Sequence, residues 1–191
     1  IEAAIVAAGS RGARIVLSGG EPTLNPRLLE WIALARSVSQ HEVWIQTNAV
    51  RLDNAALAVS IAQAGVAEAF VSLHGATAAV GDSVTDTPGT WVRSLQGIRN
   101  LCDAGVKVTL NYVLCQANMT EFSAFIELVA NRFPAVEVSF SFVAASTDLV
   151  PREVALIPRY SDMLPHLAAG LALAQQLGVH IVGFESMCGL P

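Results

Sequence analysis

The same short junction occurs three times in this chain of 191 residues, each time between a helical stretch and a run of β-branched residues. It reads Ala64-Gly65-Val66, Ala104-Gly105-Val106 and Leu177-Gly178-Val179. Glycine readily takes the left-handed conformation that ends a helix, and valine favours a strand. A helix that leads directly into a strand, several times over, is typical of a β/α repeat with right-handed crossovers, and hence of a parallel sheet.

Six short runs rich in Val, Ile and Phe are predicted to be strands, because their length and composition suit strands buried on both faces. They are residues 13–18, 41–47, 69–74, 106–114, 136–143 and 179–184. Six parallel strands can form an open doubly wound sheet or an arc of a barrel. No G-x-G-x-x-G follows any of them, so the dinucleotide-binding sheet has no support. We therefore expect the α/β class, as a partial (β/α)6 TIM-barrel-like arc with its chemistry at the carboxyl ends of the strands.

Amphipathic helices are expected between these strands. The residues predicted to begin them are Asn25 with Pro26, Asp53 or Asn54, Thr87 with Pro88, and Thr120. The stretch that contains Asp82, Thr85 and Asp86 is interpreted as a solvated polar loop, since no clustered partner suggests a metal site there.

The composition excludes several classes of protein. With 53% apolar and 14% charged residues, the chain is too hydrophobic to be disordered. Sixteen acidic against eleven basic residues, with no basic run, argue against nucleic-acid binding. No apolar run is clean enough for a membrane span and no signal segment is visible. Three separated cysteines, Cys102, Cys115 and Cys188, favour a reducing, cytoplasmic setting over a disulfide framework.

Polar residues gather where the predicted strands end. Gly19 and Gly20 follow the first strand and let the backbone approach a ligand closely, and Glu21 adds a carboxylate that suits an ammonium group. The alternative is a tight turn with a solvated glutamate. His74 ends the third strand and Asn111 lies within the fourth. Each of these two can contact a ligand or serve the fold, His74 as a cap and Asn111 through a buried hydrogen bond.

These strand ends resemble those of the radical S-adenosylmethionine (radical SAM) superfamily. Gly19-Gly20-Glu21-Pro22 resembles its GGEP motif, and Thr47-Asn48 resembles its TNG strand end, with Ala49 in place of glycine. Ser72-Leu73-His74 is similar to its SLD or SLH strand end. Asn111-Tyr112-Val113-Leu114, followed by Asn118, resembles a strand of the molybdenum-cofactor and peptide-modifying branch. The matches keep their order over nearly the whole chain.

The resemblance implies a barrel arc that cradles S-adenosylmethionine. The residues it assigns to the cofactor are Gly19, Gly20, Glu21, Pro22, Thr47, Asn48, Ser72, His74 and Asn111. Gly19, Gly20 and Glu21 would bind the amino group of the methionine part, and Ser72 or His74 would lie near the ribose or the carboxylate. In this family a [4Fe–4S] cluster reduces the sulfonium, and the resulting 5′-deoxyadenosyl radical abstracts hydrogen from a substrate. A small-molecule or peptide substrate and a reductant such as flavodoxin or ferredoxin are implied as partners of an oxidoreductase.

The chain departs from the family in its cysteines. The C-x3-C-x2-C set that holds the cluster belongs before GGEP, and no such set is present, so we expect it upstream of Ile1. We therefore expect residues 1–191 to be a single core domain, truncated at both ends and without the first strand, that alone forms no cluster and shows no turnover. Cys115 is expected to be a buried, inert thiol. Cys188 is either a hint of an auxiliary cluster or an ordinary loop thiol.

Two other functions stay open. A relative without a cluster could keep the barrel as a scaffold that binds S-adenosylmethionine or a phosphate ligand. An ordinary barrel lyase or aldolase could use the glycine turn for a phosphate. The only lysine, Lys107, lies at a strand start, away from the catalytic end, which disfavours a Schiff base.

Overall fold

The computed structural model describes residues 1–143 and 154–185. The chain divides into two compact units. The first comprises Ile1–Ser72 and Val92–Thr109, and the second comprises Leu73–Trp91 and Leu110–Pro191. Cys188, for which an auxiliary cluster was considered, lies outside the described residues.

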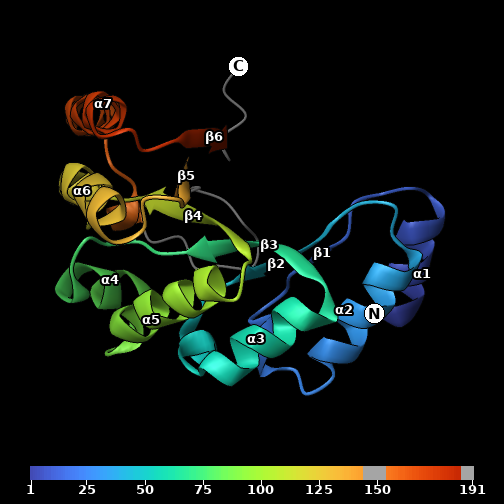
Figure 1. Cartoon of the computed structure of the whole chain (residues 1–191). Coiled ribbons are helices and arrows are strands. Elements are labelled where there is room, and N and C mark those ends of the chain that lie inside the picture. The colour runs from blue at the N-terminus through green and yellow to red at the C-terminus, as the bar shows by residue number, and fades with distance from the viewer. Residues whose placement is uncertain (144–153, 186–191) are drawn as a thin grey trace. The chain divides into compact units, whose positions relative to one another are not determined.

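The first unit alternates strands with helices (Figure 1). Its elements are α1 (Glu2–Ser10), β1 (Val16–Leu17), the 3-10 turn η1 (Pro22–Leu24), α2 (Leu28–Val38), β2 (Val43–Thr47), the 3-10 turn η2 (Val50–Asp53), α3 (Ala55–Ala64), β3 (Val66–Ser72) and most of α5 (Thr90–Asp103). β1 pairs with β2 and β2 with β3, both in parallel. α1 packs on α2, and α2 on α3. Ile32, Ile45, Ile61 and Ile98 are fully buried in its core.

The second unit repeats this alternation. The strand β4 (Lys107–Leu114) begins in the first unit and ends in the second. The other elements are α4 (Ala78–Thr85), the 3-10 turn η3 (Met119–Glu121), α6 (Phe122–Arg132), β5 (Glu137–Phe142), the 3-10 turn η4 (Val154–Leu156), α7 (Tyr160–Leu177) and β6 (Ile181–Glu185). α6 and α7 lie side by side, and β5 pairs with β6 in parallel (Figure 1). Tyr112 packs between Phe122 and Phe125, with ring centroids 5.5 and 4.5 Å away.

The six strands are parallel and form one open sheet in the order β1-β2-β3-β4-β5-β6. A doubly wound sheet would reverse its strand order at a switch point, and this order never reverses. The expected α/β class, with a barrel-like arc of parallel strands, is therefore confirmed.

The three repeated junctions act as predicted. Gly65, Gly105 and Gly178 have φ angles of 113°, 80° and 71°, in the left-handed region that favours glycine. Gly65 and Gly178 each cap the helix before a strand, and the Gly65 N–H bonds back to the last turn of α3. The sequence therefore indicated correctly where helices give way to strands.

Several predicted boundaries were wrong. Asn25 does not cap α2, because α2 begins at Leu28; the Asn25 side chain instead accepts the Arg27 N–H in a preceding turn. β1 covers only Val16–Leu17, and β3 begins at Val66, three residues earlier than predicted. The segment interpreted as a loop around Asp82 and Thr85 is helix α4. Within the described residues, no helix is both long enough and apolar enough to cross a membrane.

Candidate functional site

The turn that follows β1 is open on one side. Gly19 has a φ angle of +141°, and a Cβ atom built on Gly19 or Gly20 would meet nothing within 4 Å. Glycine is favoured at the first position by its backbone conformation, and the free space beside both lets a ligand approach the main chain. A cavity of about 490 Å³ lies along this turn and is lined by residues of α1, β1 and α2, together with Ser18 and Glu21.

The carboxylate of Glu21 holds this turn against the end of β2. Its Oε1 accepts hydrogen bonds from the Thr23 N–H, the Thr23 hydroxyl and the Thr47 hydroxyl, at 3.0, 2.6 and 2.7 Å. Its Oε2 accepts the Asn48 N–H at 2.8 Å. A carboxylate offers about four lone-pair sites, so Oε2 keeps capacity for a second donor such as an ammonium group. The predicted cofactor residues Glu21, Thr47 and Asn48 are thus brought together by direct bonds.

The turn after β2 is rigid. The Thr47 hydroxyl accepts the Ala49 N–H, and the Asn48 side chain accepts the Val50 N–H, each at 3.0 Å. Ala49 has a φ angle of 57°, which is left-handed. This explains why the resembling motif has glycine there, since an alanine in this conformation is strained.

A polar stripe on α5 supports that turn, and sequence reasoning missed it. The Ser94 hydroxyl donates to the Asn48 carbonyl at 2.8 Å, and the Asn100 side chain donates to the Leu52 carbonyl at 2.7 Å. Gly97 lies so close that a Cβ on it would be 2.1 Å from the Ala49 carbonyl oxygen. The spacing of three residues between Ser94, Gly97 and Asn100 places them on one helix face, and this was the signal available in the sequence.

His74 lies in the second unit, just after β3, and its ring is held by the neighbouring strand. The Val113 N–H donates to His74 Nδ1 at 3.2 Å. Burial lowers the pKa of His74 to about 4, and a backbone contact with Asn111 acts in the opposite direction. The imidazole is therefore neutral at neutral pH. Ser72, which the resemblance also implicates, is the last residue of β3 in the first unit.

Asn111 is buried on β4 and has a protein partner. Ser141 on β5 donates its hydroxyl to Asn111 Oδ1 at 3.3 Å. This bond provides the structural role that the sequence left open, and the amide nitrogen of Asn111 retains its donors for another acceptor.

Asn118 and Glu121 also hold the loop after β3, although sequence reasoning gave neither a role in the site. Asn118 is fully buried and donates through Nδ2 to the carbonyls of His74 and Val113, both at 2.9 Å. Glu121 accepts the Ala76 N–H at 3.0 Å and the Thr77 hydroxyl at 2.9 Å.

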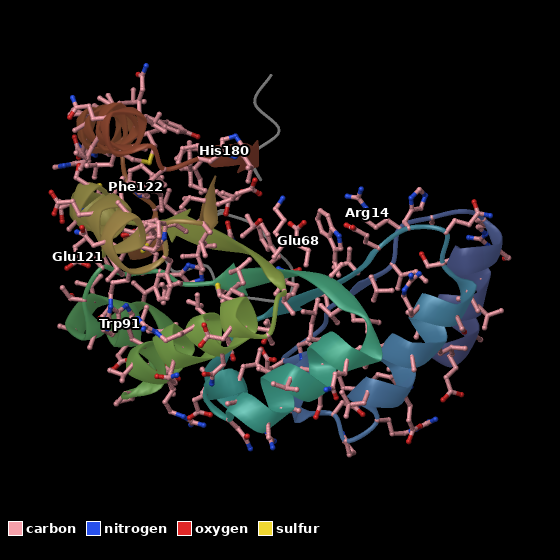
Figure 2. The ribbon with its side chains drawn as sticks, viewed as in Figure 1. Arg14, Glu68, Trp91, Glu121, Phe122 and His180 are labelled. Atoms are coloured by element: carbon pink, nitrogen blue, oxygen red, sulfur yellow. The ribbon has the colours of Figure 1, made fainter. Side chains whose placement is uncertain are left out.

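Asp82 serves the fold from within helix α4, not from the solvated loop that was expected there. Its carboxylate accepts the N–H groups of Trp91 and Gly89 at 2.8 and 2.7 Å, and these bonds lower the pKa of the carboxyl group. Trp91, labelled in Figure 2, donates its indole N–H to the Gly75 carbonyl at 2.8 Å. The Asp82 carboxylate thus caps the start of α5.

The described residues do not fit an iron–sulfur cluster. No group of three His, Cys, Asp or Glu side chains suited to a metal occurs among them. Cys102 lies on α5, and Cys115 is buried after β4, as expected. Burial also raises the pKa of the Cys102 thiol, which disfavours the thiolate that a metal needs.

Solved structures with a similar fold include radical SAM enzymes. Streptococcus suis SuiB bound to its precursor peptide SuiA superposes with a TM-score of 0.78 at 14% identity, over 98% of this chain and 42% of SuiB. Coproporphyrinogen III oxidase (HemN) from Escherichia coli gives a TM-score of 0.67 at 18% identity, over 93% of this chain and 44% of HemN. These likenesses concern the fold.

Sequence relatives point the same way. A "Probable GTP 3',8-cyclase" of Saccharolobus islandicus is 33% identical over 118 residues, which are 61% of this chain and 37% of the relative. An "AdoMet-dependent heme synthase" of Oleidesulfovibrio alaskensis is 30% identical over 117 residues, or 61% of this chain and 30% of the relative. The aligned part thus spans only about a third of each relative. The family model of the radical SAM superfamily matches residues 1–129, and the chain belongs to that superfamily.

Proposed function

We propose that this chain is the S-adenosylmethionine-binding core of a radical SAM enzyme, and that Gly19, Gly20 and Glu21 receive the amino group of the methionine part. The observation that carries this proposal is the Glu21 carboxylate, which four hydrogen bonds orient beside an open glycine turn. Oε2 has the remaining acceptor capacity for an ammonium group, and the space beside Gly19 and Gly20 is open. A pre-oriented acceptor binds a cation without having to be ordered first.

The protein groups around this site have separate tasks. Pro22 begins η1 and fixes the backbone directly after Glu21. Thr47 and Asn48 hold the carboxylate in place, and the α5 stripe holds Asn48 in turn. For Ser72, His74 and Asn111 we propose hydrogen bonds to oxygen atoms of the ligand. The chemistry that bound S-adenosylmethionine supplies in this family is hydrogen abstraction by a radical derived from it.

We further propose that turnover belongs to a longer parent protein. The described residues hold no ligand set for a cluster, so no redox step is assigned to them. We propose an oxidoreductase of the cytoplasm whose substrate is a small molecule or a peptide and whose reductant is flavodoxin or ferredoxin. A peptide substrate is supported by SuiB, which was solved with a precursor peptide. Anaerobic reconstitution with iron and sulfide is expected to give no stoichiometric [4Fe–4S] signal in this chain, and such a signal would contradict the proposal.

The two other functions, a barrel lyase and a scaffold without a cluster, require different properties of the residues at the strand ends. A lyase that forms a Schiff base needs a lysine at the carboxyl ends of the strands. Lys107 instead begins β4, and its Nζ lies 3.7 Å from a carboxylate oxygen of the buried Glu68, labelled in Figure 2. A scaffold without a cluster would bind S-adenosylmethionine equally well. It would differ from the proposed enzyme only in that its parent protein carries no cluster and no redox activity.

Calorimetric titration with S-adenosylmethionine tests the proposal. We expect Glu21→Gln to weaken binding at least about tenfold, because a charge-assisted hydrogen bond contributes roughly 1.5–3 kcal/mol. Glu42→Gln is the matched control, since it makes the same substitution at an exposed residue directly before β2. It should bind within about threefold of the wild type. Equal losses in both variants, or none in Glu21→Gln, would refute the role of the carboxylate.

A further inference from the structure

The sheet of the first unit has one face that helices cover and an opposite face on which Gln46 is exposed. α2 packs on β2 and α3 on β3. Along β2, Gln46 is exposed and Trp44 half-buried, whereas the residues before, between and after them are buried. Side chains alternate between the two faces of a strand, so Trp44 and Gln46 share the face away from the buried residues, which we call the open face. In Figure 2, Glu68, the Cα partner of Trp44, lies on the side of β3 away from α3.

Two aromatic side chains flank Gln46 on the open face. Trp44 precedes it by two positions on β2, and Phe70 is its Cα partner on β3, so the three side chains lie on the same face. Both aromatic residues are half-buried. The Arg14 guanidinium lies 4.3 Å from the centre of the Trp44 ring, a cation–π contact that helps to fix the ring. Gln46 is thus a polar group between two apolar surfaces, which is the usual composition of a ligand site.

The hydroxyl of Ser18 orients the Gln46 side chain, because it donates to Gln46 Oε1 at 3.0 Å. A glutamine amide has one acceptor oxygen and two N–H donors on its nitrogen. With Oε1 held by Ser18, the Nε2 group points away from that hydroxyl, and no acceptor for it is found in residues 1–143 and 154–185. The open face therefore carries an oriented N–H donor.

Gln46 and Thr47 are neighbours in the sequence but serve opposite faces of β2. Thr47 is buried and donates to the Glu21 carboxylate, which the proposed function assigns to the cofactor. Gln46 is turned to the open face and is not among the partners of Glu21. Ser18, which holds the amide, directly precedes Gly19 and lines the cavity along the cofactor turn. The amide therefore lies beside the proposed cofactor site without belonging to it, where a substrate that gives up hydrogen has to lie.

We propose that Gln46 recognises the substrate of this core, a peptide, by donating its Nε2–H to a carbonyl oxygen of the peptide backbone. Trp44 and Phe70 pack against the apolar groups on either side of that carbonyl, and Ser18 is the positioning residue that keeps the donor turned outward. The inference rests on the proposed function and selects the peptide from the two substrate classes that it names. An amide and a peptide carbonyl are both uncharged, so neither needs a counter-ion, whereas a phosphate group calls for a charged donor.

Titration with N-acetyl-L-phenylalanine amide, followed by NMR of the ¹⁵N-labelled chain, tests this recognition directly. The probe carries two carbonyl groups beside an aromatic side chain. We expect a saturable shift of the Gln46 Nε2 protons, and an affinity about 3- to 10-fold lower in Gln46→Met, which keeps the length of the side chain but loses the donor. Gln63→Met, at an exposed site of α3, is the matched control and should bind the probe like the wild type. Gln46 signals that do not respond to the probe would overturn the proposal.

Ser18→Ala tests the positioning role. Without the hydroxyl the amide can turn over, so we expect weaker binding of the probe and a change in the shifts of both Nε2 protons. The melting temperature should stay unchanged, because Ser18 is exposed. Ser18→Thr retains a hydroxyl and should restore the wild-type affinity. A Ser18→Ala protein that binds the probe as tightly as the wild type would refute this part of the proposal.

Separate titrations with S-adenosylmethionine and with inorganic phosphate distinguish this inference from the proposed function. We expect Gln46→Met to bind S-adenosylmethionine like the wild type, and phosphate to leave the Gln46 signals unchanged. Loss of S-adenosylmethionine binding in Gln46→Met would make Gln46 a cofactor residue and refute its role towards the substrate. A response of Gln46 to phosphate and not to the probe would refute the peptide class.

The wild type separates the two proposals. If it binds S-adenosylmethionine but not the probe, this inference fails and the proposed function stands. If it binds the probe at Gln46 but not S-adenosylmethionine, the proposed function fails and the peptide-binding site remains.

Discussion

The hydroxyl of Thr47 donates to Glu21 Oε1 across 2.7 Å, so the end of β2 determines the orientation of the carboxylate that follows β1. The same hydroxyl accepts the buried Ala49 N–H at 3.0 Å. One side chain therefore joins two strand ends and the left-handed turn after them. Three of the residues that the resemblance implicates, Glu21, Thr47 and Asn48, form a bonded cluster as a consequence.

Thr47→Val is expected to destabilise the protein by about 1–3 kcal/mol. Valine keeps the shape of threonine but leaves the Ala49 N–H buried without an acceptor, and such an unsatisfied donor costs about that much. Urea unfolding measures the change. Thr47→Ser keeps the hydroxyl and should lie closer to the wild type. A Val variant as stable as the Ser variant would show that the hydroxyl contributes nothing.

Gly97→Ala is expected to cost several kcal/mol and to weaken S-adenosylmethionine binding. The new methyl group would lie 2.1 Å from the Ala49 carbonyl oxygen, and this neighbour is backbone, so α5 or the turn after β2 has to move. Val92→Ala, an exposed site on the same helix, is the control and should stay within about 0.5 kcal/mol. Thermal melts and calorimetry of both variants test this, and a Gly97→Ala protein with wild-type stability would contradict the close approach.

Ala49 is a position where opposing effects nearly cancel. Glycine would relieve the left-handed strain, worth about 1–2 kcal/mol. It would also remove a fully buried methyl group, worth about 0.8 kcal/mol, and loosen the unfolded chain by about 0.4–1 kcal/mol. Ala49→Gly should therefore change the free energy of unfolding by less than about 1 kcal/mol. Ala49→Val should cost at least about 2 kcal/mol, because a β-branched residue fits this φ poorly. Equal stability of the two variants in urea would refute the left-handed turn.

Local patterns predicted the fold well where one residue type fixes the geometry. The junction glycines showed where helices end, and the β-branched runs gave six strands in their sequential order. Helix α4 was missed because its sequence contains Gly81, which lowers helix propensity. The structure explains that glycine, since a Cβ there would be 2.3 Å from the Trp91 ring. Glycine is required at position 81 by tertiary packing against Trp91, and a local sequence pattern does not reveal a packing partner that is distant in the chain.

The sequence motif of the site could be predicted, but the residues that hold the motif in place by hydrogen bonds could not. Gly19, Gly20 and Glu21 stand at a strand end in the sequence itself, whereas two partners of Glu21, Thr47 and Asn48, come from 26 and 27 residues further along the chain. The bonds that hold His74 span 39 and 44 residues. Which of several polar residues reaches which strand end depends on register, and register follows from packing across the sheet.

The stability of the protein should fall as the pH drops from about 6.5 to about 4. The pKa of His74 is lowered to about 4 by burial, against an ordinary value of 6.5 in the unfolded chain. Between these values the unfolded state binds the proton and the folded state does not, so the free energy of unfolding rises with pH across this window. The full contribution is on the order of 3 kcal/mol, because each pKa unit corresponds to about 1.4 kcal/mol.

His74→Gln removes this titration and serves as the reference, because every other acid-sensitive group is shared by the two proteins. The unfolding free energy of the wild type minus that of His74→Gln should be constant above pH 7 and should fall steadily towards pH 4. The pKa of Asp53 is lowered by the Arg93 side chain, and the pKa of Asp82 by the Trp91 N–H. Both carboxylates lose their stabilising effect at lower pH in both proteins, so they do not change the difference between the two. Parallel curves over the whole range would mean that His74 is protonated as easily in the fold as in the unfolded chain, and the effect of burial on its pKa would be refuted.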